Sequence, residues 1–392
     1  MPLMRWWRYL VLRSSERYAV LSMATVALLS WVLLNRAVAE GRKWSEEVFY
    51  RKPLGRPYIV IPGRDLHKAN TVIGSLRYYQ AQKGDTFLDI ARYYDLGINE
   101  LEDANPGIDP WLPPPGKPIL LPTQWVLPDV EYKGIVVNIP EMRLYYFRSA
   151  GADSTVVTTY PVGLGRDDWK TPVGKFTIRE KTVNPTWVLP QSIKEEHRRE
   201  GRPAPDFIPG GHPDNPLGKY RLRLSMPLYG IHGTNIPWGV GMQVSHGCVR
   251  LYPEDIEQLF PLVPVGTPGE FVYQPVKAGI RDGRVYLEVH KDIYDHTLAL
   301  HREARRVLEK LGLAPFVDAE KVKEVVMKQN GVPEDVTSDR VARVLRPIDS
   351  QDGARNAETA DAGRRLVLRD SARIGLAPRD KEQPRRDLEG SR

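Results

Sequence analysis

From Lys133 onward, the chain consists of short runs of β-branched and aromatic residues separated by turn residues. Runs of this length and composition are typical of β-strands. The predicted strands cover residues 135–139, 144–147, 155–162, 171–178, 221–224 and 230–231. The 392 residues include 34 prolines and 32 glycines, which favour many turns over long helices. We therefore predict an α+β protein whose largest part, residues 133–275, is a mainly β domain built as a barrel or a sandwich.

A long interval between the predicted strands, residues 184–216, is rich in proline and in charged residues. It contains one helical stretch, residues 193–199. Loops of this length inside a compact domain are uncommon unless they carry function. We predict that the interval forms a lid or a wall over a groove.

A compact segment with a different pattern, residues 78–122, precedes the β domain. Gly84, Asp85 and Thr86 form a turn, in which Asp85 or Thr86 can cap a helix by accepting a backbone N–H. Apolar residues then recur at helical spacing. Two helices, near residues 87–94 and 98–104, and a closing strand over 118–122 are predicted. The order of elements is strand, helix, helix, strand.

The first 40 residues indicate export. Four arginines precede residues 18–35, which carry no charge and would reach about 27 Å as a helix, close to the bilayer core of about 30 Å. Ala37-Val38-Ala39 has the form of a signal-peptidase site. A cleaved signal peptide and a retained anchor both remain open, and both place the rest of the chain outside the cytoplasm. A core helix is disfavoured because it needs no arginine-rich leader.

The remaining segments flank these parts. Residues 41–77 are predicted as an exported lead-in with one strand over 58–61. Residues 276–346 are predicted as an extension of one strand, over 285–289, and helices over 297–311 and 319–329. Residues 347–392 are charged and poor in aromatic residues, so we predict a disordered tail.

The chemistry centres on the single cysteine, Cys248, which has no intrachain disulfide partner. A nucleophilic thiol needs a neighbouring base, because the thiolate is the reactive form. His232 lies sixteen residues upstream, and glycines in the interval let the chain fold back. Gly247 permits a close backbone approach, amides near Cys248 could form an oxyanion hole, and Arg250 could bind a carboxylate.

Spacing alone leaves alternatives for these residues. Cys248 could be a buried, inert residue among core histidines. His232, His246 and Cys248 are also of zinc-ligand type, although His-x-Cys is not a common zinc pair and no fourth ligand is evident.

Two groups of residues resemble known families. Ser245-His246-Gly247-Cys248-Val249-Arg250-Leu251, preceded by His232-Gly233-Thr234-Asn235, resembles the active-site signature of the L,D-transpeptidases, the YkuD-like family. Lys83-Gly84-Asp85-Thr86-Phe87 and Ala104-Asn105-Pro106-Gly107 resemble the signature of a LysM module. The combination is similar to the periplasmic branch of the family, which carries an N-terminal LysM module.

The resemblance implies a peptidoglycan-modifying enzyme. Cys248 would attack the carbonyl of the third residue of a stem peptide, a diamino acid, and release D-alanine through a thioester. His232 would act as the base, and an amine of another stem or a lysine of an outer-membrane lipoprotein would accept the acyl group. Implied pocket or oxyanion residues are Gly233, Ser245, His246 and Gly247. Implied substrate contacts are Thr234, Asn235 and Arg250. Implied LysM glycan contacts are Gly84, Asp85, Thr86, Asn105 and Pro106.

Other functional classes fit the sequence less well. A formal net charge of +7 suits an anionic partner, but export argues against nucleic acid. A wall-binding protein without catalytic activity is a further alternative, which the intact cysteine motif disfavours. We predict peptidoglycan stem peptides and glycan as partners, membrane contact through the N-terminal segment if it is retained, a periplasmic location, and neither metal nor cofactor.

Overall fold

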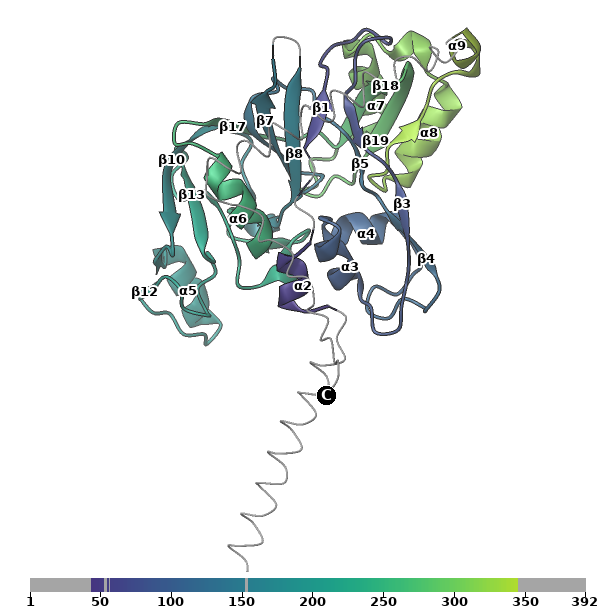
Figure 1. Ribbon diagram of the computed structural model, residues 1–392. Helices are drawn as coiled ribbons and strands as arrows, with labels where there is room; N and C mark the ends of the chain where they lie inside the picture. The colour runs from purple at the N-terminus through teal and green to yellow at the C-terminus, as the bar shows by residue number, and fades with distance from the viewer. Residues whose placement is uncertain (1–43, 53–54, 56, 152–153, 345–392) are drawn as a thin grey trace, which may run out of the picture. The chain divides into compact units, whose positions relative to one another are not determined.

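The computed structural model describes residues 44–52, 55, 57–151 and 154–344, and the chain divides into two units, Met1–Lys52 and Pro53–Arg392 (Figure 1). In the first unit, the described part is the short helix α2 (Glu46–Tyr50), which Ser45 caps. The predicted apolar span 18–35 and the predicted tail 347–392 lie outside the described residues. Among the residues that are described, no helix has the length and apolar character needed to cross a membrane.

The segment predicted as strand, helix, helix, strand has that order in the structure. Its elements are β3 (Arg77–Gln80), α3 (Phe87–Tyr93), α4 (Ile98–Ala104) and β4 (Pro118–Leu121). Strands β3 and β4 pair in antiparallel fashion. Thr86 caps α3 by accepting the Asp89 amide, and the apolar faces of both helices are buried around Phe87 and Leu101. We call residues 77–122 the βααβ module.

The predicted β domain contains one sheet of nine strands, in the order β1-β8-β7-β6-β17-β10-β13-β14-β16. These strands are β1 (Tyr58–Val60), β6 (Gly134–Asn138), β7 (Arg143–Ser149), β8 (Thr155–Pro161), β10 (Gly174–Val183), β13 (Tyr220–Leu224), β14 (Gly230–His232), β16 (Val249–Arg250) and β17 (Pro268–Val272). The sheet is open, because β1 and β16 are not paired with each other. An isolated antiparallel bridge pairs Arg250, in the last strand of the sheet, with Gly163, which follows β8. The predicted barrel or sandwich is therefore corrected to a mixed, incompletely closed sheet around one core.

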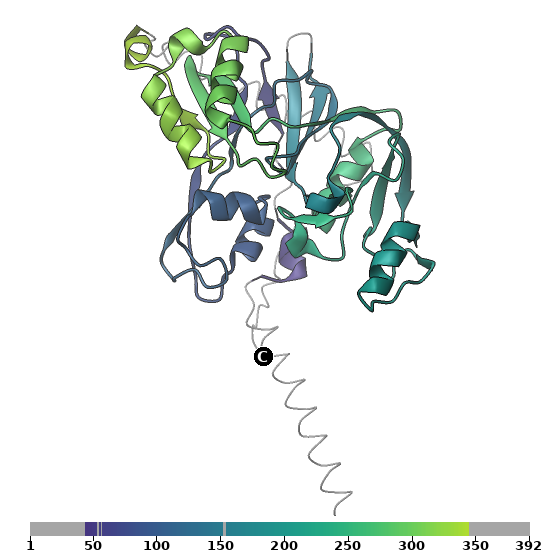
Figure 2. The ribbon, with the colours of Figure 1, turned by 180° about the vertical axis from the view of Figure 1, so that it is seen from behind.

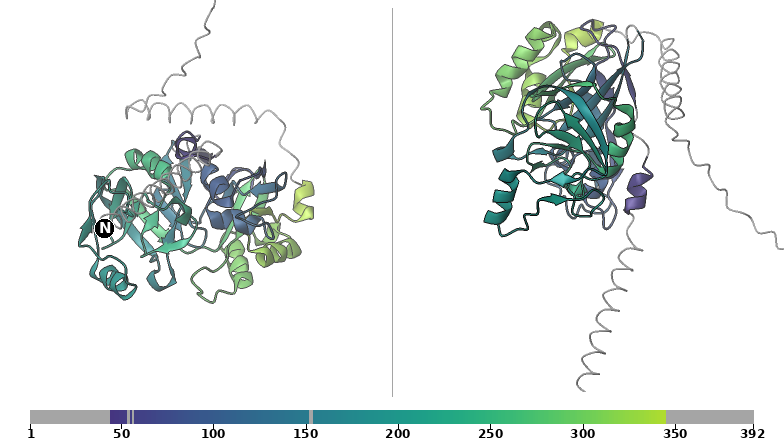
Figure 3. Two further views of the ribbon diagram at one scale, coloured as in Figure 1. Left: turned by 90° about the horizontal axis from the view of Figure 1, so that it is seen from below. Right: turned by 90° about the vertical axis from the view of Figure 1, so that its left-hand side faces the viewer.

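Smaller elements complete this region. They are β9 (Leu164–Gly165) paired with β15 (Gln243–Ser245), β11 (Trp187–Val188) paired with β12 (Phe207–Ile208), and the helices η1 (Asp167–Trp169), α5 (Gln191–Arg199), η2 (Pro237–Gly239) and α6 (Pro253–Leu262). Helix α5 lies in the long interval that follows β10, beyond the end of the β10–β13 ladder (Figure 3). The prediction lacked α6, although Pro253 at its first position is typical of a helix start.

The C-terminal extension contains a second sheet. Strands β18 (Val276–Arg281), β19 (Arg284–Val289) and β20 (Glu334–Asp335) pair in that order, and β2 (Val72–Gly74) pairs with β5 (Gln124–Val126). The helices are α7 (Leu300–Lys310), η3 (Ala314–Phe316), α8 (Ala319–Lys328) and α9 (Asp339–Val344). Helices α7 and α8 pack on the β18–β19 hairpin and share its apolar core (Figure 2). Both helices lie within the predicted ranges.

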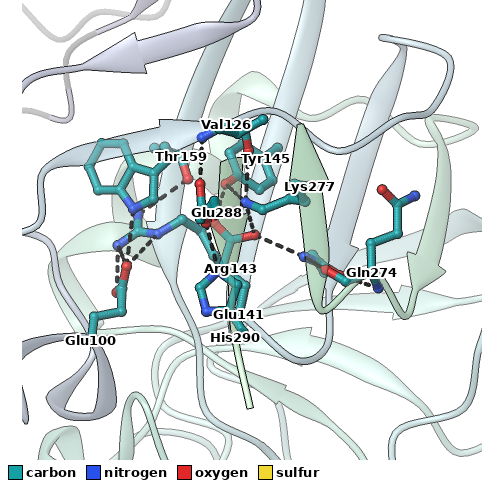
Figure 4. Close-up of polar contacts among 12 residues, drawn as sticks. Glu100, Val126, Glu141, Arg143, Tyr145, Thr159, Gln274, Lys277, Glu288 and His290 are labelled. Atoms are coloured by element: carbon teal, nitrogen blue, oxygen red, sulfur yellow. Dashed lines mark hydrogen bonds and ion pairs between the residues drawn. The ribbon is translucent and has the colours of Figure 1, made fainter. Parts of the chain in front are cut away.

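A buried polar network joins the βααβ module to the large sheet (Figure 4). Arg143 on β7 has no exposed side-chain surface and makes three bonds of 2.7–3.1 Å to the carboxylate of Glu100 on α4. The same carboxylate accepts the Gly97 amide and the Trp125 indole N–H. A buried ion pair therefore holds the βααβ module to the large sheet, in addition to the covalent chain that connects them.

Candidate active site

The register of three neighbouring strands brings the predicted catalytic residues together. In the parallel β14–β16 pair, Ile231 lies opposite Val249 and His232 opposite Arg250. Ile231 and Val249 are fully buried in the core. Successive residues of a strand face opposite sides, so His232 and Arg250 share the other face. Cys248, two residues before Arg250, lies at the start of the same face.

The Cys248 thiol is half-buried and protonated at rest. Its Sγ donates a weak hydrogen bond to the Leu228 carbonyl at 3.6 Å. Burial raises the pKa of Cys248 above its ordinary value, while the backbone at Gly230 and the charges of Arg221 and Arg250 oppose that rise. A nucleophilic reaction of this thiol at neutral pH would therefore need a base to remove its proton.

His232 has one ring nitrogen that can accept a proton. Its side chain is buried, and its Nδ1 donates a hydrogen bond of 2.6 Å to the Gly233 carbonyl, so Nε2 carries the free lone pair. Burial first, and then the charge of Arg250, lower the pKa of His232 to about 3, although the bond to Gly233 acts in the opposite direction. At neutral pH, the resting pair is consequently a thiol and a neutral imidazole.

The loop before Cys248 is held by its own side chains. Ser245 Oγ donates to the Cys248 carbonyl at 2.6 Å and accepts the Gly247 amide at 3.1 Å. Gly247 has φ +98°, and a Cβ there would lie 2.6 Å from the Tyr229 ring, so only glycine fits. Because Ser245 occupies the Gly247 amide, the amide of Cys248 itself is the better candidate in this motif for binding an oxyanion.

His246 faces the long interval and not the thiol. Its Nε2 lies 2.5 Å from Glu196 on α5, and Arg166 donates to the other oxygen of the same carboxylate at 2.5 Å. Burial opposes ionisation of Glu196, but the bonds from His246 and Arg166 prevail and lower its pKa to about 2. The predicted lid is therefore tied to the cysteine motif by a buried carboxylate. Glu196 was missed because nothing in its local sequence links it to residue 246.

The predicted residues after His232 are bound into the fold. Thr234 is buried and its hydroxyl accepts the Ile236 amide, while Asn235 donates to the Pro213 carbonyl. Gly233 lies close to α6, where a Cβ would meet Ile256 at 3.2 Å. Their part in substrate binding stays a prediction.

The predicted glycan-binding side chains also have partners inside the βααβ module. Asp85 accepts hydrogen bonds from the Tyr79 hydroxyl and the Gln82 amide. Asn105 donates to two carbonyls and accepts the Leu120 amide. Gly84 has φ +87°, Thr86 caps α3 and Pro106 is exposed. These residues shape the module, and any glycan contact from them remains a prediction.

The alternative of a zinc site is not supported by this arrangement, since His246 points to Glu196. Within the described part of the chain, one buried group has metal-ligand geometry: Glu141, Glu288 and His290. Lys277 lies among them, with its Nζ 2.7 Å from each carboxylate (Figure 4). The Lys277 ammonium thus occupies the position between the two carboxylates that a metal ion would take.

The region that contains Cys248 and His232 is similar to known proteins. The L,D-transpeptidase catalytic domain, YkuD, matches residues 132–276. The probable L,D-transpeptidase ErfK/SrfK of Escherichia coli is 37% identical over 271 residues, covering 66% of this chain and 84% of that protein. The probable L,D-transpeptidase YbiS of Escherichia coli is 44% identical over 205 residues, and the match spans 52% of this chain and 65% of the length of YbiS.

Among solved structures, an L,D-transpeptidase from Mycobacterium smegmatis is 24% identical, with 36% of this chain and 58% of that chain covered and a TM-score of 0.26. A score this low adds nothing to the sequence relationships.

Proposed function

Because this chain belongs to the YkuD-like family of L,D-transpeptidases, we propose that it cross-links or modifies peptidoglycan through an acyl-enzyme on Cys248. The donor is a tetrapeptide stem with a diamino acid at its third position. The observation that supports this best is the β14–β16 register, which places His232 opposite Arg250, two residues after Cys248, with the His232 tautomer set by the Gly233 carbonyl.

Cys248 and His232 supply the nucleophile and the proton transfers that both half-reactions need. Nε2 of His232 takes the thiol proton as Sγ bonds to the carbonyl carbon of the third residue, and the carbonyl oxygen becomes an oxyanion beside the Cys248 amide. The C–N bond to D-alanine then breaks, and the imidazolium returns its proton to the leaving amine. An acceptor amine attacks the thioester carbonyl carbon, and His232 takes the proton of the amine. The C–S bond then breaks, the new amide is released, and the proton passes from His232 to the Cys248 thiolate.

The acceptor is a side-chain amine of another stem or a lysine of an outer-membrane lipoprotein. Both substrates require a location outside the inner membrane, so we place the enzyme in the periplasm. The arginine-rich start and the uncharged residues 18–35 support export.

Purified protein incubated with tetrapeptide muropeptides tests the proposal. Mass spectrometry should show loss of D-alanine and formation of a new cross-link, and a carbapenem should acylate the protein once. Cys248→Ser should abolish transfer and labelling, since the hydroxyl is a far weaker nucleophile. Labelling that persists in this variant would show that Cys248 is not the nucleophile.

The βααβ module supports a second, accessory role in glycan binding. Tyr78, Trp111 and Leu112 are 64–70% exposed, and large apolar side chains of this kind can pack on sugar rings. The Phe87 amide donates to the Pro110 carbonyl at 2.7 Å, so the Trp111 loop lies beside the turn that opens α3. Trp111→Ala should weaken sedimentation with intact sacculi and leave turnover of soluble muropeptides unchanged. Equal sedimentation would count against glycan binding at this loop.

A further inference from the structure

Two arginines flank His232 on the strands at either side of it. In the β13–β14 ladder, Arg221 lies opposite His232, and in the β14–β16 ladder Arg250 lies opposite the same residue. Leu222, next to Arg221, is fully buried in the core, so Arg221 faces the other way, as His232 does. Arg221, His232 and Arg250 thus form one row across three strands, and Cys248 begins the adjacent row.

Arg221 also reaches toward the nucleophile. A Cβ at Gly230 would lie 3.3 Å from Arg221 Nε, so the arginine side chain lies over this glycine. A backbone hydrogen bond at Gly230 and the positive charges of Arg221 and Arg250 all act to lower the pKa of the Cys248 thiol, against the effect of burial. Glycine at position 230 leaves the room that this approach needs.

In the described part of the chain, neither arginine has a counter-ion. Among residues 57–151 and 154–344, no carboxylate forms an ion pair with Arg221 or Arg250, and the buried Nε of each has no hydrogen-bond partner. Arg223, on the same strand and the same face as Arg221, differs in this respect, since its Nε is 2.8 Å from Glu180. Arg250 is half-buried, and this burial lowers the pKa of its guanidinium.

A half-buried guanidinium without a carboxylate is costly in the free protein and favours an anionic ligand. In the proposed reaction, the leaving residue ends in a free carboxylate. Its carboxyl carbon is separated from the attacked carbonyl carbon by one nitrogen and one Cα, a span of about 3–4 Å. When the carbonyl lies against Cys248, this carboxylate must therefore lie beside the nucleophile, on the face that carries the two arginines.

We infer that Arg221 and Arg250 together bind the terminal carboxylate of the leaving residue, and so select donor stems that end in a free acid next to the scissile bond. This inference rests on the proposed transpeptidase function and assigns the substrate group that its site recognises. The arginines hold the carboxylate in the Michaelis complex and release it with the leaving amino acid.

Two synthetic donors test the inference in the wild-type full chain: a tetrapeptide stem with a free terminal carboxylate and the same stem with a terminal carboxamide. Release of D-alanine or D-alaninamide is followed by mass spectrometry. We expect kcat/KM to be about tenfold to a hundredfold higher for the acid, as for other charged hydrogen-bonded groups. Equal values for the two donors would overturn the inference but leave the transpeptidase function intact, whereas no release from either donor would count against the function itself.

Variants separate carboxylate binding from a general effect of positive charge. Arg221→Gln and Arg250→Gln should lower kcat/KM for the acid much more than for the amide, so that the preference disappears. Arg223→Gln, matched in residue type, strand and face, should keep the full preference. Lysine at position 221 or 250 should restore part of it. If the glutamine variants lose activity equally on acid and amide, the arginines support the thiol and not the carboxylate, and the inference is wrong.

Discussion

Replacing Arg143 by methionine should destabilise the protein through the contact between α4 and the large sheet. Arg143 is fully buried and Glu100 is 6% exposed at its side chain, so neither charge is screened by water. Methionine keeps much of the volume but leaves the Glu100 carboxylate without its cation. Removing one partner of a buried pair costs about 3–5 kcal/mol. At about 2–4 °C for each kcal/mol, the melting temperature should fall by about 6–20 °C.

A second substitution identifies the uncompensated charge as the cause. Glu100→Gln in the Arg143→Met background removes the charge and keeps a side-chain oxygen, which can still accept the Gly97 amide or the Trp125 indole N–H. The double variant should therefore recover most of the lost stability.

Thermal unfolding followed by circular dichroism measures these changes. Arg223→Met is the matched control, because the Arg223–Glu180 pair has similar chemistry but both side chains are about half exposed. It should melt at the wild-type temperature. If Arg143→Met also melts there, the buried pair does not hold the module to the sheet. Hydrogen exchange should show the earliest loss of protection in α3 and α4 of the Arg143→Met protein.

Two further predictions concern the active site. His232→Gln should slow carbapenem acylation of Cys248 near neutral pH, and the acylation rate should recover as the pH rises toward the raised pKa of the thiol. In wild type, the pKa of His232 is low, so the acylation rate of the free enzyme should show no histidine inflection between about pH 5 and pH 8. An unchanged rate in the variant at neutral pH would remove His232 from the mechanism. Glu196→Ala should loosen the long interval from His246, raising KM for stem peptides with little change in kcat and speeding proteolysis within residues 184–216. A fall in kcat alone would instead place Glu196 in the chemical step.

Local chemistry explains which parts of the fold were predictable. Helix α4 begins and ends at the predicted residues, because its apolar spacing and its Asn105-Pro106-Gly107 end are properties of a few consecutive residues. Strands β6 to β8 agree with the predicted runs for the same reason. The two-residue strand β16 has no periodic signal of its own, and it is a strand only because β14 lies beside it.

The sequence by itself determined most of the helices and strands and their order, since these depend on short patterns of consecutive residues, and its single cysteine led to the proposal of Cys248 and His232 as nucleophile and base. Only the tertiary structure decided which distant charges meet. Arg221 acquires its place from the register of β13 against β14, Glu196 from the position of α5, and the buried Lys277 from the approach of two carboxylates. Such meetings depend on which strands pair and on how burial changes the energy of each charge, and a linear pattern specifies neither.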